Sequence, residues 1–286
     1  MLTCSSSFYI FFGISRFKLR RIDRKLHCAV TSGGSLEKVM SLIREGADIN
    51  SRNITNNTPL WCAIVYGHEH LLGVLSTPAM LQEPVQPGSP RFYTHLAISQ
   101  RKSRALKELL KLGADVNIML HGQTLLSLAL MVRSYRCAAI ILQDSQLNIL
   151  LLNRSADHPL KFIVFDMYRC ASAYEMTRRG DMLTLMLQKG VSTNNHHLGW
   201  LPLQSCIQNP QLYWWVVQLA DQGADVNAVQ PANGLYPLLT ATLYDNFLAF
   251  ELLLSLVDMC KTSGVVESAY RHAGKNQSAL SWFCTL

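Results

Sequence analysis

A five-residue phrase that recurs along the chain constrains its fold more than any other feature. The phrase reads Gly-Ala-Asp-Val-Asn at 113–117 and 223–227, and Gly-Ala-Asp-Ile-Asn at 46–50; a degraded copy occupies 190–194. In chain order the copies begin 67, 77 and 33 residues apart. A period near 33, with 67 as two periods, is typical of an architecture of stacked repeats.

Each copy also predicts its own local structure. The copies follow apolar helical runs such as Leu106, Leu109 and Leu110. Their glycine can adopt the left-handed conformation that ends a helix. Their Asp and Asn side chains hydrogen-bond nearby backbone groups and so favour a turn. We therefore expect every copy to end a helix and to begin a turn or short hairpin.

A second phrase precedes each expected helix pair. Its clearest copy is Thr58-Pro59-Leu60-Trp61-Cys62-Ala63, followed by Gly67-His68 and an apolar run over 71–75. Proline is tolerated in the first helical turn because its missing N–H has no partner there. Together the two phrases resemble the ankyrin repeat, whose pattern runs T-P-L-H-L-A, then G-H, an apolar helix and G-A-D-V-N. The resemblance covers about residues 24–286.

The resemblance implies an all-α solenoid of about seven helix-turn-helix repeats with short hairpin loops, plus a partial eighth. We expect a basic, poorly ordered leader over 1–23 and a repeat domain over 24–286. The expected repeats are 24–50, 51–84, 92–117, 118–149, 157–194, 201–227, 234–258 and the partial 277–286. Because the last of these is a half repeat, we also expect the chain to be a truncated product or a piece of a longer protein.

Two expected repeats depart from the pattern. In 51–84 the closing phrase is lost, and prolines 78, 84, 87 and 90 predict a missing or distorted hairpin because they remove backbone donors. Repeat 157–194 has about ten extra residues, which we place between Asp166 and Arg179. Either its helices are longer or a loop bulges from one face. Such loops often carry function, and sequence drift is the alternative.

The composition argues against a disordered chain, and the cysteine spacing argues against a C-x-x-C metal or redox site. An apolar content of 49% with 16% charged residues argues against disorder. The eight cysteines never form a C-x-x-C pair. We interpret Cys28, Cys62 and Cys206 as buried thiols in a reducing compartment, which favours a cytoplasmic location.

The formal charge of +7 is concentrated at the start of the chain. Six basic residues and one acidic residue lie between 16 and 25, so the remainder is nearly neutral. A general nucleic-acid surface is therefore not expected. No apolar run approaches the roughly 18 residues that span a bilayer. Membrane contact is expected only through the leader, which also fits a mitochondrial presequence or a disordered tail.

The sequence contains no catalytic constellation that we can defend. His68-Glu69-His70 is not the H-E-x-x-H zinc motif, and two residues two apart point to different faces of a helix. His196-His197 has no Cys or carboxylate partners nearby in sequence. There is no glycine-rich phosphate loop and no G-x-S-x-G. We expect no enzyme activity, no metal and no cofactor.

With catalytic, metal and cofactor sites excluded, the remaining candidates are exposed residues that could bind a protein partner. In an ankyrin-like stack, the hairpin tips and the exposed side of the first helices line a concave face. By alignment, the partner-binding candidates on that face are Arg52, Tyr66, Met119, Val132, Gln230 and Tyr244. The alternative for the two tyrosines is that they pack sideways on the next repeat. Trp214 is a further candidate on the second helix, either as a convex-side anchor or as a cover over the extra residues of 157–194.

The resemblance also implies a modification. Asn50, Asn117 and Asn227 each follow an acidic and an aliphatic residue, with leucine eight positions upstream. Ankyrin repeats with this pattern resemble substrates of cytosolic asparaginyl hydroxylation.

The function that these features favour is non-enzymatic protein–protein interaction, as an adaptor or scaffold that binds an unidentified partner through the concave surface. One alternative is a substrate-recognition subunit of a ubiquitin ligase, although no docking box is visible in the last thirty residues. Another is the membrane-proximal cytosolic part of a larger protein.

Overall fold

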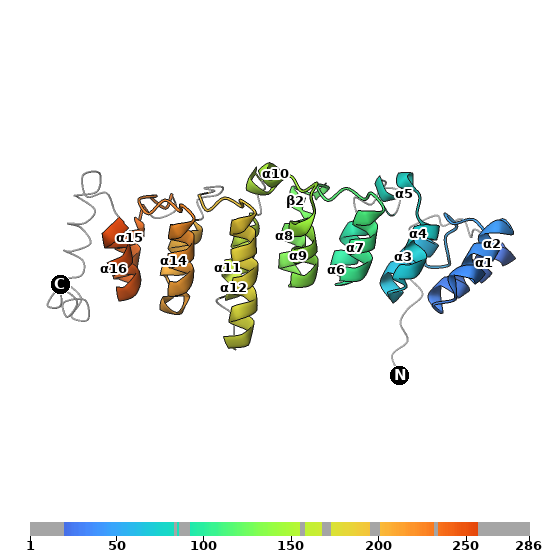
Figure 1. Cartoon of the computed structure of the whole chain (residues 1–286), viewed down its shortest axis with the longest axis horizontal. Helices are drawn as coiled ribbons and strands as arrows, with labels where there is room; N and C mark the ends of the chain where they lie inside the picture. Colours follow the sequence, from blue (N-terminus) through green and yellow to red (C-terminus); the bar gives the residue numbers. More distant parts are fainter. Residues whose placement is uncertain are drawn as a thin grey trace, which may run out of the picture.

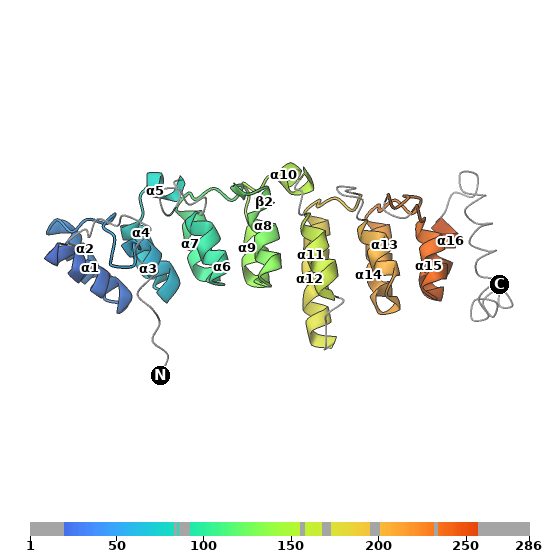
Figure 2. The same ribbon diagram turned by 180° about the vertical axis from the view of Figure 1, so that it is seen from behind.

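The computed structural model describes residues 20–82, 85, 92–154, 158–167, 173–194, 201–231 and 234–256. The expected partial repeat 277–286 and nearly all of the leader lie outside these residues. In the described part of the chain, the helices alternate between two parallel layers that run the length of the molecule (Figures 1 and 2). Most of the chain is helical, as the sequence predicts.

The first layer holds the helix that opens each pair. Its members are α1 (Arg21–Thr31), α3 (Pro59–Tyr66), α6 (Tyr93–Ser99), α8 (Leu125–Met131), α11 (Pro159–Met167), α13 (Pro202–Ile207) and α15 (Pro237–Leu243). Each contacts the next member of the layer along the chain.

The second layer holds the returning helices. These are α2 (Leu36–Arg44), the 3₁₀ helix η2 (Glu69–Leu71) with α4 (Leu72–Leu75), α7 (Ser103–Lys111), α9 (Tyr135–Gln143), α12 (Ala173–Gln188), the 3₁₀ helix η4 (Pro210–Leu212) with α14 (Tyr213–Asp221), and α16 (Phe247–Leu256). Between pairs, the chain crosses one edge of the molecule in loops that include α5 (Pro78–Gln82), the hairpin β1 (Met119–Leu120) and β2 (Gln123–Thr124), and α10 (Ile149–Arg154). We call this the loop edge, and the opposite edge, where the two helices of a pair are joined, the turn edge (Figure 1).

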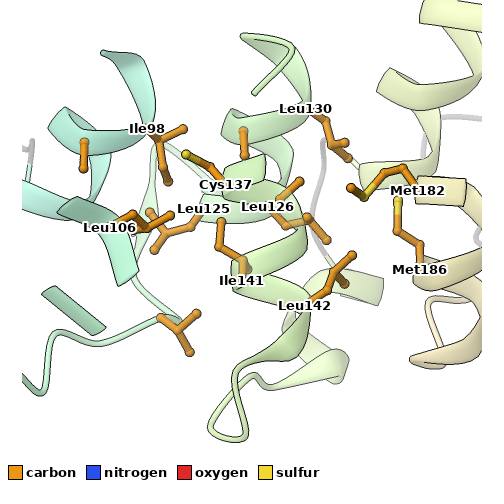
Figure 3. Close-up of a cluster of buried hydrophobic side chains, with 14 of the residues drawn as sticks. Ile98, Leu106, Leu125, Leu126, Leu130, Cys137, Ile141, Leu142, Met182 and Met186 are labelled. Atoms are coloured by element: carbon orange, nitrogen blue, oxygen red, sulfur yellow. The ribbon is translucent and has the colours of Figure 1, made fainter. Parts of the chain in front are cut away.

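The core is continuous from pair to pair. Figure 3 shows Leu106 of α7, Leu126 of α8 and Met186 of α12 among the side chains buried between neighbouring pairs. Each is completely buried. Burying a leucine or methionine side chain contributes about 1.5–3 kcal/mol to stability. A single helix pair cannot bury both of its apolar faces by itself, so each pair depends on its two neighbours.

The recurring phrase has the local structure that its residues predict. Gly46, Gly113, Gly190 and Gly223 all have φ between 80° and 96°, the left-handed region. The carboxylates of Asp48, Asp115 and Asp225 each accept a 2.8 Å hydrogen bond from the N–H two residues later. At the helix starts, the hydroxyl groups of Thr58 and Thr124 accept N-cap hydrogen bonds. These parts of the prediction are confirmed.

The structure differs from the sequence-based expectation at the start of α1, and it decides what the proline-rich stretch and the extra residues of 157–194 form. The proline-rich stretch that follows α4 forms the short helix α5, and residues 83–84 and 86–91 lie outside the described part. The extra residues of 157–194 lengthen α12 to 16 residues, so that this helix reaches beyond its neighbours at the turn edge (Figure 1). Helix α1 begins at Arg21, inside the segment assigned to the leader, because Arg20 pairs with Asp23 at 2.8 Å and Asp23 accepts the N–H of Asp48. The exact repeat boundaries stay predictions.

One prediction about a side chain is wrong, and of the two alternatives for Trp214 the cover is excluded while the anchor stays a prediction. Cys28 is exposed, whereas Cys62 and Cys206 are buried; α1 is the first helix described, so no earlier described helix covers Cys28. Trp214 is 61% exposed, and it is Trp215 that packs against the lengthened α12. A one-residue shift on a helix turns a side chain by about 100°, so neighbouring tryptophans face opposite environments.

The contact between Trp215 and Gly180 can be tested. A Cβ atom on Gly180 would lie 1.8 Å from Cη2 of Trp215. We expect Gly180→Ala to lower the free energy of unfolding by about 2 kcal/mol because overpacking forces the helices apart. Urea denaturation followed by circular dichroism measures this.

Gly73 on α4 provides the matched control, since a Cβ there would meet no atom within 4 Å. Gly73→Ala should leave stability unchanged or raise it by about 0.5 kcal/mol. Equal effects of the two substitutions would contradict the packing described here.

Candidate functional site

The turn edge carries a spaced series of exposed apolar side chains. They lie at or just after the C-terminal ends of first-layer helices: Tyr66 is 56% exposed, Met131 47%, Phe165 50%, Leu243 36% and Tyr244 46%. The equivalent residues after α6 and within the α13 turn are polar, namely Ser99, Gln100, Gln208 and Asn209. We call the five apolar residues the apolar series of the turn edge.

The sequence-predicted partner-binding residues do not form one site. Tyr66, Val132 and Tyr244 lie at the turn edge, with Val132 half-buried against the core. Arg52, Met119 and Gln230 lie in loops at the loop edge, and Trp214 lies on the second layer. A helix of eight residues is about 12 Å long, so the two edges are separated by at least that distance.

Arg52 is engaged within the chain. Its guanidinium donates to the carbonyl oxygens of Asn56 at 3.0 Å and Val85 at 3.3 Å, and so bridges two loops. Tyr66 and Tyr244, in contrast, project into solvent. The turn edge, rather than the loop edge, therefore concentrates accessible aromatic side chains.

Sequence reasoning selected Val132 and overlooked its neighbour Met131, which is the more exposed. It also overlooked Phe165 and Leu243. All three occupy the last or nearly last turn of a first-layer helix, one position before the slot of Tyr66 in their own repeats. Extending the alignment by that one position would have found them.

A buried ion network joins the turn edge to the lengthened helix. Asp166, near the end of α11, is 7% exposed and lies 2.8 Å from Nε of Arg179 on α12 and 2.7 Å from Nη2 of Arg133 in the α8–α9 turn. Tyr135 of α9 donates its hydroxyl hydrogen to the same carboxylate and accepts a 3.2 Å hydrogen bond from Arg179. The network fixes α12 against the preceding pair.

The network also shifts the ionisation of its members. Burial raises the pKa of the Tyr135 hydroxyl group to about 12, and the hydrogen bond to Asp166 adds to the increase. Burial acts to lower the pKa of Arg179, but hydrogen bonds to Tyr135 and Asp166 outweigh it and leave the pKa raised. Tyr135 is therefore neutral and Arg179 charged at neutral pH.

Asparagine side chains of the recurring phrase join successive loops at the loop edge. Asn117 donates from Nδ2 to the carbonyl of Gln146 at 2.8 Å and accepts at Oδ1 from the N–H of Asn148 at 2.7 Å. Asn194 bonds Gly223 and Asp225 in the same way. This bridging use of the phrase was not predicted from sequence.

The three candidate hydroxylation sites differ in accessibility. The Asn50 side chain is exposed, and the described residues offer its amide no hydrogen bond. The amide of Asn117 is bonded at both ends, and Asn227 is half-buried. All three stay predictions, and Asn50 is the one most open to a modifying enzyme.

No three His, Cys, Asp or Glu side chains among the described residues are grouped so that they could hold a metal ion. Within the same residues, no helix combines the length and apolar character that crossing a lipid bilayer requires.

Comparisons with known proteins give the same architecture. The ankyrin repeat family model matches residues 26–54. The human ASB11 ankyrin repeat domain is 19% identical, with a TM-score of 0.54 over 80% of this chain and 96% of that domain. The chain has the fold of an ankyrin-repeat domain.

A second solved structure agrees with this assignment. The ankyrin repeat domain of Bcl-3, a member of the IkappaB protein family, is 24% identical, with a TM-score of 0.56 over 76% of this chain and 92% of that one. At these identities the likeness is one of fold. None of the curated proteins compared with this chain matches it in sequence.

Ankyrin-repeat domains generally mediate protein–protein interaction, and the fold is typically a non-enzymatic module. Residues 26–54 include the second half of α1, the whole of α2 and the first copy of the recurring phrase. The other copies of the phrase, which the family model does not match, nevertheless adopt the same backbone geometry.

The asparagine bridge can be tested by substitution. We expect Asn117→Ala to lower the free energy of unfolding by about 1–2 kcal/mol because two hydrogen bonds between successive loops are lost. Asn50→Ala should change it by less than about 0.5 kcal/mol. Comparable losses in urea denaturation would show that the bridge does not stabilise the stack.

Disrupting the ion network around Asp166 should lower the free energy of unfolding more than disrupting the asparagine bridge. Asp166→Asn leaves the buried Arg179 guanidinium without its counter-charge, and we expect a loss of about 3 kcal/mol. Glu108→Gln is the control, because Glu108 and Lys111 pair at 2.7 Å with exposed side chains; exposed pairs contribute less than about 1 kcal/mol. A tolerated Asp166→Asn substitution would contradict the role given to the network.

Proposed function

We propose that this protein is an adaptor or scaffold that binds an extended segment of a protein partner along its turn edge. The apolar series of the turn edge is the single observation that carries the proposal. Aromatic and long aliphatic side chains that reach solvent are favoured binding anchors, since a few such contacts dominate binding free energy.

The spacing of the series indicates the shape of the partner. Tyr66 ends α3 and Tyr244 follows α15, with α6, α8, α11 and α13 between them in the layer. A partner that contacts both tyrosines must therefore extend along several repeats. The polar interruptions after α6 and α13 divide the series into separate contact points.

Rigidity of the surface supports the same proposal. Phe165 lies one residue before Asp166, whose carboxylate is held by Arg133 and Arg179. Helix α12 reaches beyond the turn edge next to this point (Figure 2). A preorganised surface binds with a smaller loss of conformational entropy, and the protruding helix would limit how a partner can be placed on the edge.

Met119, Gln230 and Arg52 are proposed as secondary contacts at the loop edge, and Trp214 as an anchor on the second layer. Location in the cytoplasm is part of the proposal and agrees with the thiols of Cys62 and Cys206, which are buried and free.

The proposal is tested by affinity purification with mass spectrometry, using the full chain and a Tyr66→Ala/Tyr244→Ala double variant. We expect the recovery of specific partners to fall at least fivefold in the variant, because two anchors are removed from opposite ends of the surface. Leu150→Ala/Leu256→Ala is the control, since these side chains are 64% and 48% exposed but lie on α10 in the loop edge and at the end of α16 away from the turn. Unchanged recovery by the tyrosine variant would contradict the proposal.

A further inference from the structure

The helices of the first layer expose no carboxylate. Asp23 and Asp166 are the only acidic residues in the seven described first-layer helices, and they are 4% and 7% exposed. Each is paired with an arginine at 2.8 Å. Exposed carboxylates along the turn edge can therefore come only from the turns that join the first layer to the second.

The turns after α6 and α8 are basic. Arg101 and Arg133 take the same place in these two turns, both in the left-handed region with φ 54° and 56°, and Lys102 follows Arg101. In the last described pair the same place is taken by Asp245, with φ 51°, next to Tyr244. The charge of the turn edge therefore changes sign along its length, from basic near α6 and α8 to acidic near α15.

The cations lie beside members of the apolar series of the turn edge. Nζ of Lys102 is 3.4 Å from the position that a Cβ atom would take on the glycine that follows Tyr66. Nη2 of Arg133 is 2.7 Å from Oδ1 of Asp166, the residue after Phe165. Apolar side chains and cations therefore alternate along the edge between α3 and α11.

The described part of the chain does not neutralise these cations. Asp166 pairs with both Arg133 and Arg179, so one carboxylate faces two guanidinium groups. Arg179 is buried, whereas the side chain of Arg133 is 45% exposed and carries the excess charge to the surface. No described carboxylate lies within 4.0 Å of Arg101 or Lys102. An excess of positive charge at a surface attracts an anionic partner.

The nearest acidic residue in the neighbouring turn, Glu69, belongs to a different surface. It lines a depression of the second layer between α4 and α7, together with Arg104, Lys107 and Glu108. Acidic and basic side chains are matched in that depression, so it selects neither sign of charge. The basic character of the turn edge does not depend on any of these four residues.

We propose that the partner segment that binds the turn edge is acidic where it passes the turns after α6 and α8. Its carboxylates pair with Arg101, Lys102 and the exposed side of Arg133, as charge-assisted hydrogen bonds favour. Its apolar side chains contact Met131 and Phe165. This inference rests on the proposed function, because it names the chemistry of the partner at the same surface.

The spacing of the helices sets the spacing of the carboxylates. Packed helices lie about 8–10 Å apart, and an extended chain advances about 3.3 Å per residue. Carboxylates that reach Arg101 and Arg133, which follow adjacent helices of the layer, are therefore about three residues apart in the segment. The distance from Tyr66 to Phe165 covers three such steps, or about nine residues.

A polypeptide fits these observations better than a nucleic acid or a bilayer. Successive bases of a single strand stack on aromatic side chains that lie close together, but Tyr66 and Phe165 are three helices apart, with Ser99 and Met131 between them on the edge. Helix α12 reaches beyond its neighbours next to Phe165 (Figure 1). This protrusion holds a flat bilayer away from the edge, whereas a single chain can pass beside it.

The test measures the fluorescence anisotropy of two fluorescein-labelled peptides of about 12 residues, long enough to pass from α3 to α11. One consists of Glu-Glu-Leu repeats and the other of Gln-Gln-Leu repeats, and both are titrated with the full chain in low salt. We expect the glutamate peptide to bind at least tenfold more tightly. Its advantage should decrease in high salt because exposed charges are screened.

Charge-reversal variants locate the binding. Arg101→Glu/Lys102→Glu should weaken binding of the glutamate peptide at least tenfold and leave binding of the glutamine peptide within twofold. Lys38→Glu/Arg44→Glu on α2 makes the same change of net charge at exposed positions and should leave both within twofold. Circular dichroism confirms that each variant is folded.

An anchor variant separates failure of this inference from failure of the proposed function. Met131→Ala/Phe165→Ala should weaken binding of both peptides at least fivefold because it removes apolar contacts. If it does so while the two peptides bind wild type equally, the apolar series binds a partner but the acidic chemistry is wrong. If it changes the binding of neither peptide, the proposed function fails as well.

The inference also fails if the wild-type chain binds neither peptide, or if the α2 variant loses as much affinity as Arg101→Glu/Lys102→Glu. It fails too if phosphatidylserine vesicles or single-stranded DNA bind more tightly than the glutamate peptide and Arg101→Glu/Lys102→Glu abolishes that binding. A preference for the glutamate peptide that is lost in this variant and kept in the α2 variant supports it.

Discussion

The burial of each helix pair's apolar faces between its two neighbours is the interaction on which this structure depends. Helix α8 contributes Leu125 and Leu126, both completely buried, and it is covered by α6 on one side and α11 on the other. Because each pair covers the next, the core is continuous and the stability of one pair depends on adjacent ones. The outer ends of the helices take no part in this packing and are free to vary.

The loops provide a second coupling between repeats. The side chains of Asn117 and Asn194 connect one loop to the next. Two side chains on first-layer helices also bond to these loops: His27 contacts the carbonyl of Ser51, and Gln204 donates to the carbonyls of Ala228 and Leu235. Glutamine thus replaces histidine at this slot because its amide N–H reaches the same backbone acceptors. These hydrogen bonds set the spacing of the loop edge. The turn edge has bonds of the same kind, since His68, His70 and Asn246 contact the carbonyls of Thr31, Gly34 and Ile207 in the preceding pairs.

The turn edge is also where the chain departs from a regular repeat. Lengthening α12 leaves its first turns beyond the neighbouring helices, and the buried Asp166 network secures the part that remains in the layer. Arg101 and Arg133 keep a left-handed backbone where glycine would be unstrained. Exposed Met131 and Phe165 lie on the same edge. The fold tolerates the left-handed arginines, the lengthened α12 and the exposed apolar side chains because none of them alters the core between the two layers.

The sequence by itself determined the helix pairs, their order and their punctuation. Glycine at 46, 113, 190 and 223, the adjoining Asx turns and the threonine caps act within a few residues, so the period of the phrase was sufficient to predict them. Only the tertiary structure decided that Trp215 rather than Trp214 covers α12, that Cys28 is exposed, and that Asp166 collects Arg133, Tyr135 and Arg179. Tyr135 and Arg179 are 44 residues apart, and which side chains meet at such a separation depends on the rotation and length of each helix in the stack, which no local pattern encodes.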